Sequence, residues 1–268
     1  MDDAAREHYD LGLEQGRLGS GAGSLELVRT RELLDRFLPK PPAVVLDVGG
    51  GPGLYARMLA DLGYQVTLID LMPLHVEQAS RRSEACPEAP FTARLGDARD
   101  LDEDDESCDA VLLLGPLYHL IQREQRLQAL AEAHRVLRPG GLVVGAGISR
   151  FASLLDGLAT GDAADPRFAS IIRHDLRDGQ HRNTAPDEHP DWFTTAFFHH
   201  PDELAAEVAE AGFTCEALLG VEGPGWLFAE RWEDSEVLLE AARAVEAEPA
   251  LCGLSAHLLV VGRKAQSA

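Results

Sequence analysis

The sequence predicts an α/β fold in which helices cover both faces of one mostly parallel, doubly wound sheet. Short apolar runs alternate five times with stretches of helical spacing between residues 43 and 148, a pattern typical of parallel βαβ units. The first run, residues 43–48, is almost continuously apolar, as expected for a strand that is buried on both faces. A glycine-rich turn follows the first run, where sheets of this class often bind ligands.

The expected strands and helices follow one another in a regular order. Helical spacing begins at residues 24–38 and ends at a cluster of prolines, residues 39–42. The expected strands are residues 43–48, 65–70, 91–95, 110–114, 142–148 and 257–262. The expected later helices are residues 54–62, 73–85, 122–137, 201–211 and 233–246.

Two long segments have no place in this alternation, and they divide the chain into four expected parts. Residues 1–40 would form a helical N-terminal lid and residues 41–148 the core. Residues 149–193 would be an inserted cap, and residues 194–268 would complete the core sheet. The insertion contains enough apolar side chains to pack as a cap, among them Phe151, Leu154, Leu155, Phe168, Ile171 and Ile172.

The charge balance excludes whole classes of partner. Acidic residues number 45 and basic residues 24, so the formal net charge is −21. Binding to nucleic acid or to an anionic membrane depends on clustered cations, so we expect neither partner. No run approaches the ~20 apolar residues that span a bilayer. The start, Met1-Asp2-Asp3, lacks the basic and apolar character of a signal peptide, and we expect a cytoplasmic protein.

The glycine-rich turn has a specific pattern, Asp47-x-Gly49-x-Gly51-x-Gly53. Glycines at a strand-to-helix turn let the backbone approach a ligand closely. A phosphate-binding P-loop would continue with Lys and Ser or Thr, but Leu54 follows Gly53. A dinucleotide-binding turn would need a third glycine at the position of Leu54. The pattern therefore indicates a different ligand.

This pattern resembles motif I of the class I S-adenosylmethionine-dependent methyltransferases. The resemblance covers residues 43–148 well and implies a Rossmann-like, seven-stranded sheet whose last strand, from His257, runs antiparallel. It implies S-adenosylmethionine as the cofactor, with S-adenosylhomocysteine as product, and no metal; the four cysteines form no C-x-x-C pair. Four further segments support the resemblance. They are Asp70 after the second strand, Gly96-Asp97-Ala98 after the third, residues 114–120 after the fourth, and the turn Arg138-Pro139-Gly140-Gly141.

The resemblance also implies roles for individual residues at the cofactor site. Asp70 would accept hydrogen bonds from the ribose hydroxyls, and Asp97 would accept one from the adenine amine. Asp47 would orient the turn or receive the ammonium group of the methionine part. The expected cofactor-binding residues are Asp47, Gly49, Gly51, Gly53, Asp70, Leu71, Asp97, Ala98 and Leu114, with Tyr9 contributed by the lid.

The implied reaction is methyl transfer to an O, N or S nucleophile of a small molecule. Family members that methylate nucleobase amines often carry Asn/Asp-Pro-Pro-Tyr after the fourth strand. This chain carries Gly115-Pro116-Leu117-Tyr118 there and lacks the polar side chain. Two alternatives remain open at this point: a nicotinamide-dependent oxidoreductase, and a non-catalytic protein that retains the cofactor pocket.

Three residues are candidates for the chemistry itself. His119 is the first candidate for a general base, because it follows the fourth strand and histidine exchanges protons near neutral pH; packing behind the site is its alternative role. Tyr118 is expected to form a wall or to bond the cofactor. His200 could face the pocket, or could simply begin the helix at residue 201. Trp226 and His257 are further candidates for lining the substrate cavity.

Overall fold

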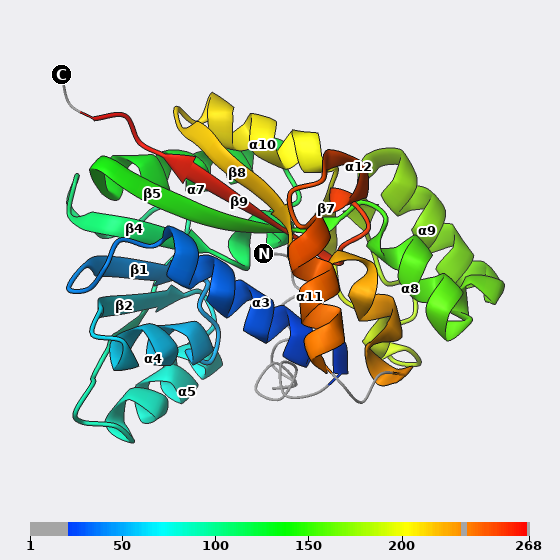
Figure 1. Ribbon diagram of the computed structural model, residues 1–268, viewed down its shortest axis with the longest axis horizontal. Helices are drawn as coiled ribbons and strands as arrows, with labels where there is room; N and C mark the ends of the chain where they lie inside the picture. Colours follow the sequence, from blue (N-terminus) through cyan, green and yellow to red (C-terminus); the bar gives the residue numbers. More distant parts are fainter. Residues whose placement is uncertain (1–20, 232–234, 267–268) are drawn as a thin grey trace.

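The structure is a computed structural model that describes residues 21–231 and 235–266. Its centre is a nine-stranded sheet within these residues, with helices on both faces (Figure 1). Seven strands lie side by side in the order β3 (Thr92–Leu95), β2 (Gln65–Asp70), β1 (Val44–Val48), β4 (Cys108–Leu113), β5 (Leu137–Ser149), β9 (His257–Arg263) and β8 (Thr214–Gly220). Two short strands, β7 (Ala196–His199) and β6 (Gln180–His181), extend the sheet beside the end of β5. The expected count of seven was too low because β6 and β7 belong to segments without a clear strand pattern.

The first half of the chain alternates strands and helices as expected. Its elements are α3 (Gly21–Phe37), β1 (Val44–Val48), α4 (Leu54–Asp61), β2 (Gln65–Asp70), α5 (Pro73–Glu84), β3 (Thr92–Leu95), β4 (Cys108–Leu113), α6 (Pro116–His119), α7 (Arg123–Val136) and β5 (Leu137–Ser149). Strand β5 begins five residues earlier than expected, because Leu137 already pairs with Cys108 of β4.

The second half contains the insertion and the end of the sheet. Its elements are α8 (Ala152–Thr160), η1 (Asp162–Ala164), α9 (Pro166–Asp178), β6 (Gln180–His181), η2 (Pro190–Trp192), β7 (Ala196–His199), α10 (Pro201–Glu210), β8 (Thr214–Gly220), η3 (Gly223–Arg231), α11 (Ser235–Val245), α12 (Pro249–Cys252) and β9 (His257–Arg263). Strand β9 runs antiparallel to β5 and to β8, which confirms the expected direction of the last strand.

Two apolar layers hold the helices on the sheet. Buried side chains of α3, α4 and α5 pack against one face, and those of α6, α7 and α10 pack against the other. Figure 1 shows α3, α4 and α5, in blue to cyan, on the near side of the strands. Because the parallel strands run in one direction, their carboxyl ends lie at one edge of the sheet. The loops that lead to both helix layers meet at this edge. Among the described residues, no helix is both long enough and apolar enough to cross a membrane.

The insertion packs as a small layer with its own core. Phe168, Ile171, Ile172 and Trp192 form a buried cluster between α9 and η2. Helices α8 and α9 lie together at one end of the molecule, on the right of Figure 1. The short strand β6 pairs with β7, and β7 pairs with β5 at residues 148–149. The insertion is thus joined to the sheet at the carboxyl end of β5.

A buried ion pair connects α7 to α10 near the edge of the sheet at which the parallel strands end. Arg126 donates two hydrogen bonds to Glu207, of 2.9 and 2.6 Å, and both side chains are at most 4% exposed. The same guanidinium donates to the carbonyls of Leu120 and Ile121, so it also holds the end of the segment after β4. Burial raises the pKa of Glu207, but the contacts from His199 and Arg126 outweigh it and lower that pKa to about 2.

We expect Glu207→Gln to cost about 3–5 kcal/mol of the free energy of unfolding, because it leaves the Arg126 charge buried without compensation. The matched control is Glu210→Gln on the same helix, whose solvent-exposed pair with Arg123 should contribute little to the free energy of unfolding. Urea denaturation at pH 7 measures both. The Glu207 contribution should persist at pH 5 and be lost as the pH falls from about 4.5 towards 2. Equal costs for the two variants would contradict this account.

Candidate functional site

Three cavities meet at the carboxyl edge of the sheet. The sheet-edge pocket, of about 130 Å³, lies beside the ends of β2 and β3. The glycine-loop cleft, of about 240 Å³, lies between the β1–α4 turn and the end of β4. The cap cavity, of about 470 Å³, lies between the insertion, α3 and η3. Tyr118 of α6 lines all three cavities, so they adjoin one another at this side chain.

The turn between β1 and α4 depends on its glycines. Gly49, Gly51 and Gly53 have φ values of 71°, 56° and 82°, in the left-handed region that side chains disfavour. A Cβ at Gly49 would lie 2.6 Å from the ring of Pro116, and one at Gly50 would lie 2.5 Å from Asp47 Oδ2. The turn therefore brings its backbone close to two neighbouring segments and leaves the face at Gly51 open.

Asp70 links the end of β2 to this turn. Its Oδ2 accepts a hydrogen bond of 2.9 Å from the Gly51 N–H. Its Oδ1 accepts one of 2.9 Å from the Met72 N–H, and the His75 ring nitrogen Nδ1 lies 3.2 Å away. A carboxylate offers about four acceptor sites, so Asp70 can still accept from a ligand in the sheet-edge pocket.

Asp47 is a buried carboxyl beneath the glycine turn. Burial, and secondarily the negative charge of Asp70, raise its pKa to about 7. Its Oδ2 has no hydrogen-bond partner among the described residues. A buried anionic oxygen without a donor is costly, and a cation in the adjoining glycine-loop cleft would compensate it.

Asp97 is bound to a neighbour in its own loop. Arg99 donates hydrogen bonds of 3.0 and 2.6 Å from its guanidinium to the two carboxylate oxygens, and its N–H donates a third of 2.9 Å. The Arg99 side chain lowers the pKa of Asp97, against the opposing effect of partial burial. Asp97 is therefore an ionised, oriented acceptor at the rim of the sheet-edge pocket.

The structure brings most of the predicted cofactor residues to these cavities. The sheet-edge pocket is lined by Gly49, Gly51, Asp70, Leu71, Asp97 and Ala98, and the glycine-loop cleft by Asp47, Gly49, Gly51 and Leu114. Gly53 is instead the N-cap residue of α4 and faces Ala79 and Phe91. Tyr9 lies outside the described residues.

The candidate bases are placed differently from one another. His119 lines the sheet-edge pocket and is not among the residues that line the cap cavity. His200 is the N-cap residue of α10. Its N–H donates a hydrogen bond to Glu203, its ring packs edge-on against Phe151, and it lines none of the three cavities. His257 lines both the glycine-loop cleft and the cap cavity. Trp226 also lines the cap cavity, as the sequence suggested.

The cap cavity combines aromatic walls with carboxylates. Its aromatic walls include Phe168, Trp192, Phe193, Phe198 and Trp226, and its carboxyl groups are Glu26, Asp156, Asp191 and Glu222. No lysine or arginine is among its described lining residues. Burial, followed by the charges of Asp162 and Asp191, raises the pKa of Asp156. The carboxylates were not predicted as site residues, because they come from four separate segments with no common sequence pattern.

Comparison with known proteins supports the resemblance seen in the sequence. A family model described as a methyltransferase domain matches residues 45–141. An uncharacterised methyltransferase of Mycobacterium tuberculosis is 35% identical over 126 residues, which cover 46% of this chain and 48% of that protein. The ubiquinone biosynthesis O-methyltransferase of Methylocella silvestris is 33% identical over 118 residues, which cover 43% of this chain and 44% of that protein. The chain thus matches about half the length of these curated relatives.

The fold extends the likeness over most of the chain. The crystal structure of an S-adenosylmethionine-dependent methyltransferase from Methanosarcina mazei superposes with a TM-score of 0.62. The two chains are 17% identical, and the superposition covers 88% of this chain and 98% of the other. The matched domain, the relatives and the shared fold agree with the motifs: residues 45–141 match a methyltransferase domain, and the chain is similar in sequence and in fold to S-adenosylmethionine-dependent methyltransferases.

Proposed function

We propose that this chain transfers the methyl group of S-adenosylmethionine to a small-molecule acceptor bound in the cap cavity. The observation that carries the proposal is the meeting of three cavities at Tyr118. Two of them adjoin the glycine turn and suit the donor, and the third is formed mainly by the insertion and suits an acceptor. The protein's task is then to align the two reactants and to exclude water between them.

The residues beside the glycine turn fit this donor. When bound, S-adenosylmethionine supplies a methyl group that its cationic sulfonium activates. Asp47, whose Oδ2 has no partner among the described residues, would compensate the positive charge of the methionine part. Asp70 would accept hydrogen bonds from the ribose hydroxyls, and Asp97 one from the adenine amine. The donor carries no phosphate, and residues 49–53 carry no lysine or arginine.

The cap cavity favours an acceptor that is neutral or cationic and has an aromatic or apolar body. Aromatic rings contribute dispersion and attract cations over their faces. The four carboxyl groups of the cavity repel an anion and attract an ammonium group. The nucleophile of such an acceptor would be a hydroxyl or an amine, placed beside Tyr118.

The choice of acceptor would reside in the insertion and in the first turns of α3. Segment 149–193 supplies eight of the described lining residues of the cap cavity, Ala152, Ser153, Asp156, Phe168, His181, Asp191, Trp192 and Phe193, and α3 supplies Ala22, Gly23 and Glu26. The donor residues come instead from β1 and β2 and from the turns that follow β1, β2, β3 and β4. Residues 41–148 would therefore bind the donor whatever the acceptor is.

We expect Asp70→Asn to weaken S-adenosylhomocysteine binding at least about tenfold, because the charge-assisted hydrogen bonds to the ribose are lost. Isothermal titration measures the Kd, and the matched control is Asp102→Asn, whose side chain is fully exposed in the loop between β3 and β4. Circular dichroism checks that both variants fold. An unchanged Kd in a folded Asp70→Asn protein would contradict the ribose assignment, and tight binding of NADH in place of S-adenosylhomocysteine would contradict the donor itself.

We expect Asp47→Asn to stabilise the ligand-free protein while weakening its binding of S-adenosylmethionine. The pKa of Asp47 rises from 3.8 to about 7 in the folded state, so the wild type loses stability as the pH increases through this range. Asparagine avoids that loss, and the gain in unfolding free energy should reach at most about 4 kcal/mol at pH 8 and be smaller at pH 5. Urea denaturation at the two pH values measures it. A destabilised variant at pH 8 would show that Asp47 is needed in its ionised form without ligand.

We expect methyl transfer to cationic phenols and none to matched anionic phenols, because the cap cavity carries carboxylates and no lysine or arginine among its described lining residues. A phenol with an aminoethyl arm and one with a carboxymethyl arm provide the matched pair within a wider panel of small phenols and amines. Release of S-adenosylhomocysteine and the mass of the methylated product report turnover. Preferred turnover of the anionic member would contradict the acceptor class, and no turnover of any acceptor would contradict the proposed activity.

A further inference from the structure

His257 occupies the boundary between the donor side and the acceptor side of the site. It is the first residue of β9, and it lines both the glycine-loop cleft and the cap cavity. Glu26 and Tyr118 line the same two cavities. His119, the candidate from the sequence, lines the sheet-edge pocket instead. His257 is therefore better placed than His119 to contact the reacting part of an acceptor.

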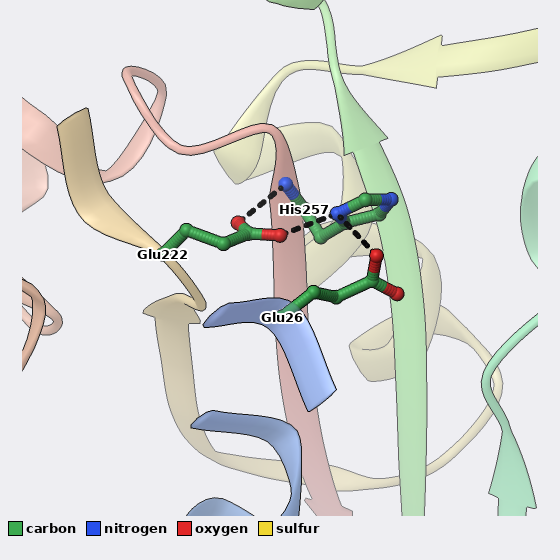
Figure 2. Close-up of side chains that lie close together, drawn as sticks. All are labelled: Glu26, Glu222 and His257. Carbon is green, nitrogen blue, oxygen red and sulfur yellow. Dashed lines mark hydrogen bonds and ion pairs between the residues drawn. The ribbon is translucent and has the colours of Figure 1, made fainter. Parts of the chain in front are cut away.

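A buried carboxylate holds the imidazole of His257 in place. Glu222, only 1% exposed, follows β8 and places its Oε1 2.6 Å from His257 Nδ1 (Figure 2). Its Oε2 accepts a hydrogen bond of 3.0 Å from the His257 N–H and one of 2.6 Å from the Ser255 hydroxyl. The Glu222 N–H in turn donates to the Ser255 oxygen. Both carboxylate oxygens are thus oriented by protein donors.

This arrangement determines which ring nitrogen is basic. An ionised carboxylate only accepts hydrogen bonds, so Nδ1 of His257 carries the proton that it shares with Glu222. In a neutral imidazole with a proton on Nδ1, the basic nitrogen is Nε2. If Nε2 takes a proton, the imidazolium is stabilised by Glu222 and by Glu26, whose Oε2 lies 3.7 Å from Nδ1. The same logic orients the histidine of hydrolytic triads.

We propose that His257 is the general base of methyl transfer and that Glu222 is its positioning residue. The proposal rests on the proposed function. The acceptor's oxygen or nitrogen forms a bond to the methyl carbon while the carbon–sulfur bond breaks and its electron pair stays on sulfur. The acceptor's proton passes to His257 Nε2, so the positive charge of the sulfonium is replaced by that of the imidazolium. The proton leaves to solvent before the next turnover.

A metal site is the competing use of the same side chains. Glu26, Glu222 and His257 offer donor atoms within 4.8 Å of one another. However, both oxygens of Glu222 already accept hydrogen bonds from the protein, and Nδ1 is bonded to one of them. Figure 2 shows Glu222 and Glu26 both directed at Nδ1 rather than spread around an open centre. The geometry is that of a hydrogen-bonded histidine–carboxylate pair.

The first test needs no acceptor. Long-range 15N NMR of histidine-labelled protein reports which ring nitrogen carries the proton, and the His257→Gln spectrum assigns the signals. We expect the Nδ1-protonated form at pH 8. In Glu222→Gln the titration midpoint of this ring should fall by about one pH unit or more, because a negative charge at Nδ1 is lost while Glu26 remains. A proton on Nε2 at pH 8, or a midpoint unmoved by Glu222→Gln, would overturn the proposal.

The second test measures turnover of an acceptor from the panel. His257→Gln should lower kcat at least about 100-fold while the Kd of S-adenosylhomocysteine changes less than about threefold. Glu222→Gln should move the rising limb of the rate–pH profile to lower pH, and imidazole should partly restore His257→Ala. The controls are His174→Gln, on the exposed face of α9, and Glu210→Gln.

The outcomes separate this proposal from the one on which it rests. Full turnover by a folded His257→Gln protein would overturn the role of the pair and leave methyl transfer intact. The proposed roles of His257 and Glu222 would also be overturned, in favour of the metal site, by one binding result. In that result divalent cations bind the wild type but not Glu222→Gln, and they displace the Nδ1 proton. A wild type that methylates no acceptor would overturn the proposed function and the pair together.

Discussion

The strand-to-helix turn at residues 49–53 constrains everything built around it. Three of its residues have φ values that favour glycine, and Gly50 has no space for a side chain above Asp47. Because the turn is so tight, the Gly51 N–H reaches Asp70 at the end of the neighbouring strand. On its other side Gly49 packs against Pro116, the first residue of the helix that carries Tyr118. The sheet-edge pocket and the glycine-loop cleft are therefore both formed against one short turn, and they share Tyr118 with the cap cavity.

The carboxyl groups at the site differ from those in the rest of the described protein in whether they have basic partners. Elsewhere many carboxylates are paired with arginines, and Glu207 shows that even a buried one keeps a low pKa when Arg126 bonds it. At the site, Asp47 and Asp156 have raised pKa values because burial is not offset by a basic partner. Such groups lower the stability of the empty protein, and a cationic ligand removes that cost. The uncompensated charge therefore favours ligands of positive charge.

The sequence predicts those parts of the site that are local in the chain. The glycine turn, Asp70 and Asp97 each lie at the end of a run that predicts a strand. The run that predicts the strand therefore also locates the site residues at its end. Strand β8 was not predicted, because its residues range from exposed to buried without an alternating pattern. His257 and Glu222 are 35 residues apart in the sequence, and Glu26 lies near the other end of the chain. Only tertiary packing brings them together, so no local pattern indicates their association.

The register of two antiparallel strands explains how the proposed base is held. Strands β8 and β9 pair up to Gly220 and Leu258, and the Val221 N–H then bonds the His257 carbonyl. Residues just after β8 and at the start of β9 are consequently neighbours at the carboxyl edge of the sheet. His257 and Glu222 are thus positioned by the sheet, whereas the walls of the cap cavity come mainly from the insertion. A base fixed on the sheet allows the insertion to change the acceptor without moving the group that takes its proton.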